Sequence, residues 1–222
     1  MKDRKLTAPE MGRLTVEEYR SRKGSGTVVV LDNVRSAYNV GSAFRSADAF
    51  GADKVLLCGI CAVPPSAEIH KTALGAEEAV PWERYADTLE AVAALKAEGY
   101  TVVSVEQTVN SVKLTQAGCA KSSVSVPHET RATLGIVRGG TACGGAERSE
   151  AVEGGTTPDT ALPDGNPAAK YAFIFGNEVE GVQQSVVDAS DFCLEIPQHG
   201  TKHSLNVAVT VGIVLFATSP AR

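Results

Sequence analysis

The chain has 222 residues, a length that suits one α/β domain or one such domain with an insertion. Hydrophobic residues make up 43% of it, enough for a buried core, and the longest apolar run, at 207–217, is too short to cross a bilayer. The net charge of −5 does not by itself favour a nucleic-acid partner. Residues 1–45, however, hold nine Lys/Arg against five Asp/Glu. This basic section permits a local phosphate-binding face, although an ordinary mixed surface has the same pattern.

The N-terminal residues and the cysteines indicate a compartment. The first 23 residues are charged and lack the apolar core of a secretory signal. Five cysteines without such a signal are typical of a reduced, cytoplasmic protein. We therefore expect a cytoplasmic location and no membrane association.

The first elements along the chain are two helices and two strands. Residues 15–22 predict a short helix, because Thr15 and Glu18 have the spacing of a capping box. The β-branched run at 27–31 predicts a strand buried on both faces of a parallel sheet. Helical spacing of apolar residues follows at 39–50 and ends at Gly51. Residues 54–58 predict the second strand.

The remaining elements continue the alternation. We expect helices at 70–77, at 88–98 and around 182–188, and an apolar helix opened by Ser204. Strands are expected at 100–105, 171–175 and 192–196. This order predicts an α/β fold with a mainly parallel sheet and helices on both faces.

One segment does not fit this alternation. Of the 56 residues at 114–169, 33 are Gly, Ala, Thr, Ser or Pro, and none is aromatic. Such a composition buries too little apolar surface to offset the entropy of ordering the chain. We interpret 114–169 as a disordered insertion. It interrupts a domain at 27–222 that follows an N-terminal extension at 1–26.

Two motifs suggest metal or redox chemistry. Cys58 and Cys61 form a single C-x-x-C, which suits a redox pair or half a zinc site. Because no second pair follows, small apolar cysteines are the preferred interpretation. His199 and His203 have the spacing of a helical zinc pair, but Gly200 places them in a loop. We expect no metal.

Five polar residues stand near the ends of predicted strands or the starts of predicted helices. Asn39 lies at a helix N-terminus and Arg45 lies among apolar positions. Glu178 follows a strand directly, where Gly176 lets a ligand approach the backbone. Ser204 suits a helix cap, and Asn206 is polar in an otherwise apolar helix. Structural roles explain the first four residues as well as a functional role does. The structural explanation is weaker for Asn206, because a buried Asn must be hydrogen-bonded to something.

Three sequence blocks together resemble the SpoU/TrmH-type RNA 2′-O-ribose methyltransferases of the SPOUT superfamily. They are LDNVRSAYNVGSAFRSADAFGADKVLLCG at 31–59, FIFGNEVEGV at 173–182 and LEIPQHGTKHSLNVAVTVGIVLF at 194–216. The blocks occur in the family's order, and they cover nearly all of the predicted core.

The resemblance implies a fold and a site that the residue pattern alone does not. It implies a C-terminal trefoil knot, bound S-adenosylmethionine and a homodimer. The residues matched to the family's cofactor loops are Val105, Glu106, Gly176, Ile196, Gln198, Ser204 and Leu205. The residues matched to its characteristic polar positions, the expected catalytic set, are Asn39, Arg45, Glu178, Ser204 and Asn206.

The implied activity is methyl transfer to a ribose 2′-OH of tRNA or rRNA. A base methyltransferase of the same fold and a non-catalytic RNA-binding or cofactor-sensing dimer are the alternatives. A guanidinium keeps its proton, so we interpret Arg45 as a clamp on phosphate and hydroxyl rather than a general base. Only about 26 residues precede the first strand. RNA is therefore expected to contact residues 1–23 and the dimer surface.

Overall fold

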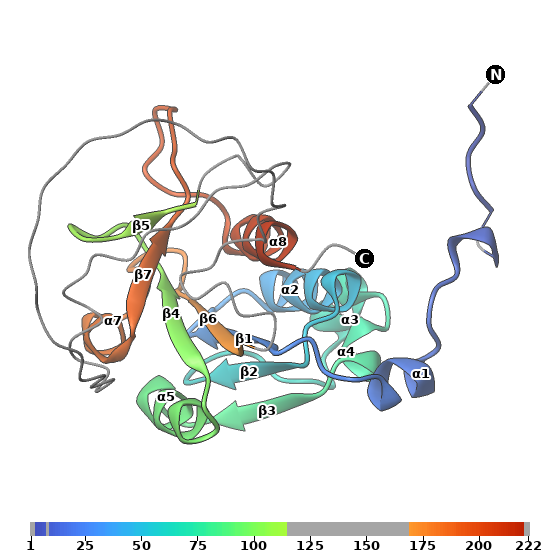
Figure 1. Ribbon diagram of the computed structural model, residues 1–222, viewed down its shortest axis with the longest axis horizontal. Helices are drawn as coiled ribbons and strands as arrows, with labels where there is room; N and C mark the ends of the chain where they lie inside the picture. Colours follow the sequence, from blue (N-terminus) through green and yellow to red (C-terminus); the bar gives the residue numbers. More distant parts are fainter. Residues whose placement is uncertain (1–2, 8, 115–168, 220–222) are drawn as a thin grey trace, which may run out of the picture.

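A seven-stranded sheet forms the centre of the computed structural model, which describes residues 3–7, 9–114 and 169–219 (Figure 1). The order of the strands in the sheet is β3-β2-β1-β6-β4-β7-β5, and every neighbouring pair is parallel. The strands are β1 (Thr27–Asp32), β2 (Lys54–Cys58), β3 (Trp82–Tyr85), β4 (Thr101–Val105), β5 (Val112–Lys113), β6 (Tyr171–Phe175) and β7 (Phe192–Glu195).

Helices cover both faces of this sheet, as the sequence predicted. The helices α2, α3, α4 and α8 pack on one face, and α5 and α7 pack on the other (Figure 1). The helical elements are η1 (Pro9–Met11), α1 (Val16–Ser21), α2 (Ala37–Phe50), α3 (Ala67–Ala73), α4 (Ala76–Ala79), α5 (Thr88–Ala97), α7 (Gln184–Ala189) and α8 (Val207–Thr218).

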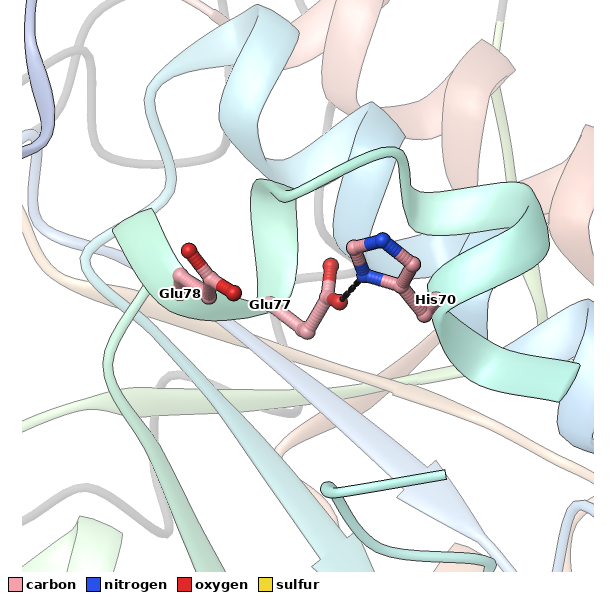
Figure 2. Close-up of side chains that lie close together, drawn as sticks. All are labelled: His70, Glu77 and Glu78. Carbon is pink, nitrogen blue, oxygen red and sulfur yellow. Dashed lines mark hydrogen bonds and ion pairs between the residues drawn. The ribbon is translucent and has the colours of Figure 1, made fainter. Parts of the chain in front are cut away.

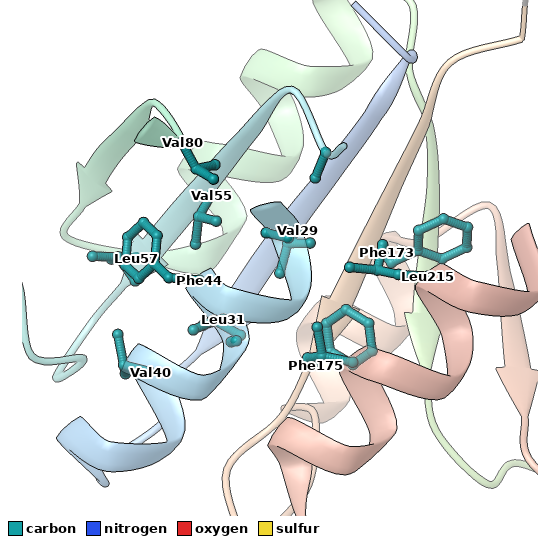
Figure 3. Packing of buried hydrophobic residues seen from close by; sticks show 14 of the residues in the cluster. Val29, Leu31, Val40, Phe44, Val55, Leu57, Val80, Phe173, Phe175 and Leu215 are labelled. Carbon is teal, nitrogen blue, oxygen red and sulfur yellow. The ribbon is translucent and has the colours of Figure 1, made fainter. Parts of the chain in front are cut away.

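The apolar core is divided between the two faces by the alternation of side chains along each strand. In β1, Val29 and Leu31 point toward α2 and α8, while Val28 and Val30 point toward α5 and α7. Phe173 and Phe175 of β6 pack with the first group (Figure 3). This two-sided burial explains why the central strands are continuous apolar runs.

The structure confirms the five predicted strands and adds two at the edges. In β3 no residue is fully buried, so its sequence lacks the apolar run of a central strand. In β5 there are only two residues, too few to show any period. Both are short edge strands, which are the least visible in a sequence.

Two expected helix boundaries are wrong. The helix expected at 70–77 is two helices, α3 and α4, because Leu74 and Gly75 adopt left-handed backbone conformations between them. The helix expected around 182–188 is confirmed as α7. The last helix does not open at Ser204: α8 begins at Val207 with Asn206 as its cap. The capping box of Thr15 and Glu18 at the start of α1 is confirmed.

Two expectations fall outside the part of the chain that the structure describes. The insertion expected at 114–169 lies outside it except for its first and last residues. The described residues do not directly show the implied knot, which remains a prediction. Within the described residues, no helix is both long enough and apolar enough to cross a membrane.

Candidate functional site

The strand register brings three loops to one place at the carboxyl edge of the sheet. Leu31 of β1 and Val105 of β4 are both level with Phe175 of β6, which lies between them. The residues that follow these strands therefore lie side by side. In an open parallel sheet this edge is where ligands bind.

A cavity of about 330 Å³ lies at this edge. Its walls are the segments after β4 and β6, the loop between β7 and α8, and the start of α8. Its lining includes all seven residues matched to the family's cofactor loops: Val105, Glu106, Gly176, Ile196, Gln198, Ser204 and Leu205. The structure therefore brings this predicted set together.

The loop 176–181 forms one wall of the cavity and is internally hydrogen-bonded. The backbones of Asn177 and Gly181 form an antiparallel bridge, with two hydrogen bonds of 3.1 Å. The side chain of Asn177 accepts hydrogen bonds from the amides of Val179 and Glu180 at 2.9 and 2.8 Å. A Cβ atom at Gly176 would lie 1.9 Å from the carbonyl carbon of Gly181, so only glycine fits there.

Three of the five expected catalytic residues form a hydrogen-bonded chain beside the cavity. Asn206 donates from Nδ2 to Oδ1 of Asn39 at 3.2 Å. Asn39 in turn donates from Nδ2 to Oε1 of Glu178 at 2.6 Å. The oxygen of Asn206 accepts from the amides of Ala208 and Val209 at the start of α8. The helix end thus fixes which way both amides face, and Glu178 receives a donor.

The two other expected catalytic residues are not part of this chain. Ser204 is exposed and lines the cavity. Arg45 is exposed on α2 and lines a separate cavity of about 420 Å³ with Ser46 and Phe50 among its walls. Within the described residues, the guanidinium of Arg45 has no hydrogen bond or ion pair. Within one protein molecule, the five expected catalytic residues are therefore not gathered at one place.

The cap of α8 corrects the interpretation of two residues. The sequence assigned the capping role to Ser204 and treated Asn206 as a buried polar residue. In the structure Asn206 is exposed and is the N-cap, because its side chain is the one that reaches the free amides. Both amino acids are good caps, so the apolar pattern alone could not decide between them.

Several polar residues of this region were not predicted. Gln107 lines the cavity and donates to the backbone carbonyl of His203 at 3.0 Å, which ties two of the walls together. Asp32 ends β1 and is fully buried. A carboxylate directly after four buried apolar residues is a signal that could have marked Asp32. For Gln107 the sequence carries no comparable signal.

The cysteines are structural, as preferred from the sequence. Cys58 and Cys61 are buried. Burial raises the pKa of the Cys58 thiol to about 12 and that of Cys61 to about 11. Cys61 accepts a hydrogen bond from the amide of Val34 and donates to the carbonyl of Leu31. These thiols remain protonated at neutral pH, which does not suit redox exchange.

His70, Glu77 and Glu78 lie close together at the junction of α3 and α4 (Figure 2). They form the one group of His, Cys, Asp or Glu side chains within the described residues that could hold a metal ion. His70 Nδ1 and Glu77 Oε1 are 2.6 Å apart, so a hydrogen bond between the two helices already explains this pair. The expected absence of a metal remains a prediction.

The His70–Glu77 pair should make stability depend on pH. The hydrogen bond and the charge of Glu77 raise the pKa of His70. A raised pKa means that the pair stabilises the fold fully below the unfolded pKa of about 6.5, and that this contribution is lost as pH rises through the folded pKa. We expect His70→Gln to lower the melting temperature more at pH 6 than at pH 8.5. An equal loss at both pH values would contradict this role.

Substitutions at Asn206 should separate its two roles. Asn206→Ala should cost about 1 kcal/mol in urea unfolding, because it removes the cap of α8. Asn206→Asp keeps an acceptor for the free amides but removes the donor to Asn39, so it should cost less than about 0.5 kcal/mol. Ser204→Ala is the matched control and should leave stability unchanged. A larger loss for Ser204→Ala than for Asn206→Ala would restore Ser204 as the cap.

Comparisons with known proteins agree with this geometry. The model of the SpoU rRNA Methylase family matches residues 26–135 and 140–216. The chain is 28% identical over 191 residues to 23S rRNA (guanosine-2′-O-)-methyltransferase RlmB of Nitrosomonas europaea, covering 86% of this chain and 55% of that protein. The chain thus spans little more than half the length of this relative.

Two solved structures share the fold. An AdoMet-bound rRNA methyltransferase from Sinorhizobium meliloti has a TM-score of 0.61 at 24% identity, covering 90% of this chain and 59% of that one. The A. aeolicus TrmH/SpoU tRNA modifying enzyme has a TM-score of 0.62 at 18% identity, covering 92% and 79%. The family model matches well over half of the sequence, including the three blocks that carry the resemblance. The chain belongs to the SpoU rRNA methylase family.

Proposed function

We propose that this protein is an S-adenosylmethionine-dependent methyltransferase that modifies a ribose 2′-OH of tRNA or rRNA. The observation that supports it most is that all seven residues matched to the family's cofactor loops line one cavity at the carboxyl edge of the sheet. The names of the relatives point to the same chemistry, because RlmB is a guanosine-2′-O-methyltransferase. Buried free cysteines and an RNA substrate also favour a cytoplasmic location.

The cavity fits the proposed cofactor in size and chemistry. Its volume of about 330 Å³ lies in the usual range of small-molecule sites. Apolar side chains that are not buried, such as Ile196 and Leu205, offer surface for a flat base. The carboxylates in the lining complement a positive sulfonium, and they belong to Glu106, Glu178, Glu180 and Glu195.

The proposed reaction needs alignment more than activation. The bound cofactor would supply an electrophilic methyl group, and this chemistry requires no metal ion. Holding two reactants in line can contribute about 7–11 kcal/mol. Asn39 and Asn206 orient Glu178 at the cavity. The guanidinium of Arg45, which has no partner among the described residues, is available to bind a phosphate and to stabilise the hydroxyl oxygen as it loses its proton.

We further propose that the protein is a homodimer through the outer face of α8. Val209, Ile213 and Phe216 are spaced four and three residues apart and form an exposed apolar stripe. Phe216 packs against Phe50, which shares a cavity with Arg45. A second copy on this stripe would therefore lie next to Arg45. The cavity loops and Arg45, which one chain keeps apart, would then face a common substrate.

The N-terminal segment offers fewer RNA contacts than its charge suggests. Arg22 donates to the carbonyls of Gly51 and Ala52 at 2.7 and 2.8 Å, and Arg20 donates to the carbonyl of Glu78. Both therefore hold the segment on the domain. Within 1–23, the proposed RNA contacts are therefore made by the other basic residues. The dimer surface provides the remaining contacts.

Methyl transfer to RNA tests the proposal directly. The full chain would be incubated with methyl-labelled S-adenosylmethionine and either tRNA or rRNA, and the RNA would then be digested with alkali. We expect label in alkali-resistant dinucleotides, because a 2′-O-methyl group blocks cleavage at the next phosphate. Label in mononucleotides would indicate base methylation instead. Cofactor binding without any transfer would favour the non-catalytic alternative.

Arg45→Lys should lower kcat about tenfold or more and leave cofactor affinity unchanged. Lysine keeps the charge but cannot form the two-pronged contact of a guanidinium, and tenfold corresponds to about 1.4 kcal/mol. The control is Arg84→Lys, an exposed arginine on edge strand β3. Single-turnover methyl transfer and calorimetric titration of the cofactor provide the two measurements. Full activity of Arg45→Lys would contradict the role of Arg45 as a clamp on phosphate and hydroxyl.

Val209→Glu should dissociate the proposed dimer at micromolar concentration. Val209 is 51% exposed on α8 near its N-terminus, where a carboxylate does not oppose helix formation. A buried, unpaired charge in an apolar interface costs several kcal/mol. The control is Val109→Glu, at a fully exposed valine in the segment after β4. Light scattering gives the mass, and a dimer that survives Val209→Glu would place the interface elsewhere.

A further inference from the structure

Two carboxylates hold the loop after β6 from opposite sides. In the sheet, β6 lies between β1 and β4. Asp32 is the last residue of β1, and Glu106 directly follows β4. Asp32 accepts the amide of Gln183 at 3.0 Å, and Glu106 accepts the amide of Val182 at 3.0 Å. Two successive amides at the end of the loop are thus held by the two neighbouring strands.

Asp32 is an unusual residue for a core position. It is fully buried, and within the described part of the chain it has no ion pair. Its charge is instead met by neutral donors: Oδ1 accepts from Thr88 at 2.6 Å, from Asn33 at 2.9 Å and from the side chain of Gln183 at 3.0 Å. A buried carboxylate is costly unless it is fully hydrogen-bonded. Two of its four hydrogen bonds come from Gln183, so the loop provides half of what Asp32 requires.

Glu106 lines the cavity, but its oxygens are already engaged. Oε1 accepts the amide of Gln107 at 2.8 Å, and Oε2 accepts the amide of Val182. A Cβ atom at Gly181 would lie 2.2 Å from Oε2, so the loop backbone runs directly against this carboxylate. Glu106 therefore holds the loop in addition to lining the cavity, where the family resemblance implies a cofactor contact.

We propose that Asp32 and Glu106 form a carboxylate clamp that fixes the wall 176–181 of the cavity. Asp32 does not line the cavity, so it is a positioning residue that acts through Gln183. The proposal rests on the proposed function for its effect on the cofactor. Its effect on the loop does not depend on any ligand. Without the clamp, residues 176–181 keep their internal bridge but lose their fixed place against the other walls.

Hydrogen exchange in the ligand-free protein tests the clamp directly. Asp32→Asn replaces one acceptor oxygen with a donor while keeping size and shape. We expect exchange in a peptide covering 177–190 to become about tenfold faster, because a hydrogen bond to a charged group is lost. A peptide covering 37–50 in α2 serves as the internal reference and should change little.

Asp53→Asn is the matched control variant. Asp53 also accepts backbone amides, those of Ser25 at 2.5 Å and Gly26 at 2.8 Å, but it lies at the opposite edge of the sheet. Asp53→Asn should lower the free energy of unfolding about as much as Asp32→Asn does. It should change the exchange rate at 177–190 by less than about twofold. Equal acceleration of 177–190 in both variants would show a general loss of stability and would overturn the clamp.

Cofactor titration and a double variant complete the test. Asp32→Asn should weaken binding of S-adenosylmethionine about tenfold, while Asp53→Asn should not. In the combination Asp32→Asn with Glu106→Gln, acceleration of exchange should be smaller than the product of the two single effects, because the two carboxylates hold adjacent amides, of Gln183 and Val182, in one loop. Purely multiplicative effects would overturn a joint role. If the unaltered protein does not bind the cofactor, the proposed function fails, and the exchange data still decide the clamp.

Discussion

The parallel register of β1, β6 and β4 is the constraint on which the candidate site depends. These strands are buried on both faces, and the large side chains of β6 fix how the strands align. A shift of one residue would turn every core side chain of a strand to the wrong face. Because core packing fixes the register, it also fixes the relative positions of Asp32, Glu106 and Gly176 at one edge of the sheet. A site formed at the carboxyl ends of these strands is held rigidly by the sheet.

Close backbone contacts carry this rigidity into the loops. Gly176 lies against the peptide between Gly181 and Val182, with no room for a side chain. Gly41 of α2 similarly lies against the carbonyl of Ile69, so α2 and α3 approach closely. Asn39 sits on α2, and its place relative to Glu178 depends on that packing. The same side chains that fill the core thus set the distances in the polar network.

Much of the fold was predictable, because the central strands and helices have strong local patterns. The run at 27–31 and the spacing at 39–50 each permit one interpretation. The edge strands β3 and β5 were not predictable, since their residues are only partly buried and their pairing depends on neighbours distant in sequence. The break at Leu74 was likewise invisible, because leucine rarely adopts a left-handed conformation.

For the candidate site, the family resemblance identified the lining of the cavity but not the connections within it. No residue pattern shows that Glu106 holds a loop or that Arg45 stands apart from Glu178. Both facts arise from tertiary distances. Side-chain hydrogen bonds between residues more than 100 positions apart, such as that of Asn39 with Glu178, have no local sequence signature.

The cap of α8 has a consequence for how this protein can change over generations. Asn206 serves the helix and the polar network with different atoms of one amide. Among side chains of this length, only an amide offers the acceptor for the helix end and the donor to Asn39 on separate atoms, since a hydroxyl must use one oxygen for both and a carboxylate has no donor. If only folding mattered, a threonine or an aspartate could replace Asn206, because either can cap the helix. If the hydrogen bond to Asn39 also matters, selection should keep asparagine at this position. Related proteins that no longer use the polar network should therefore have other capping residues here.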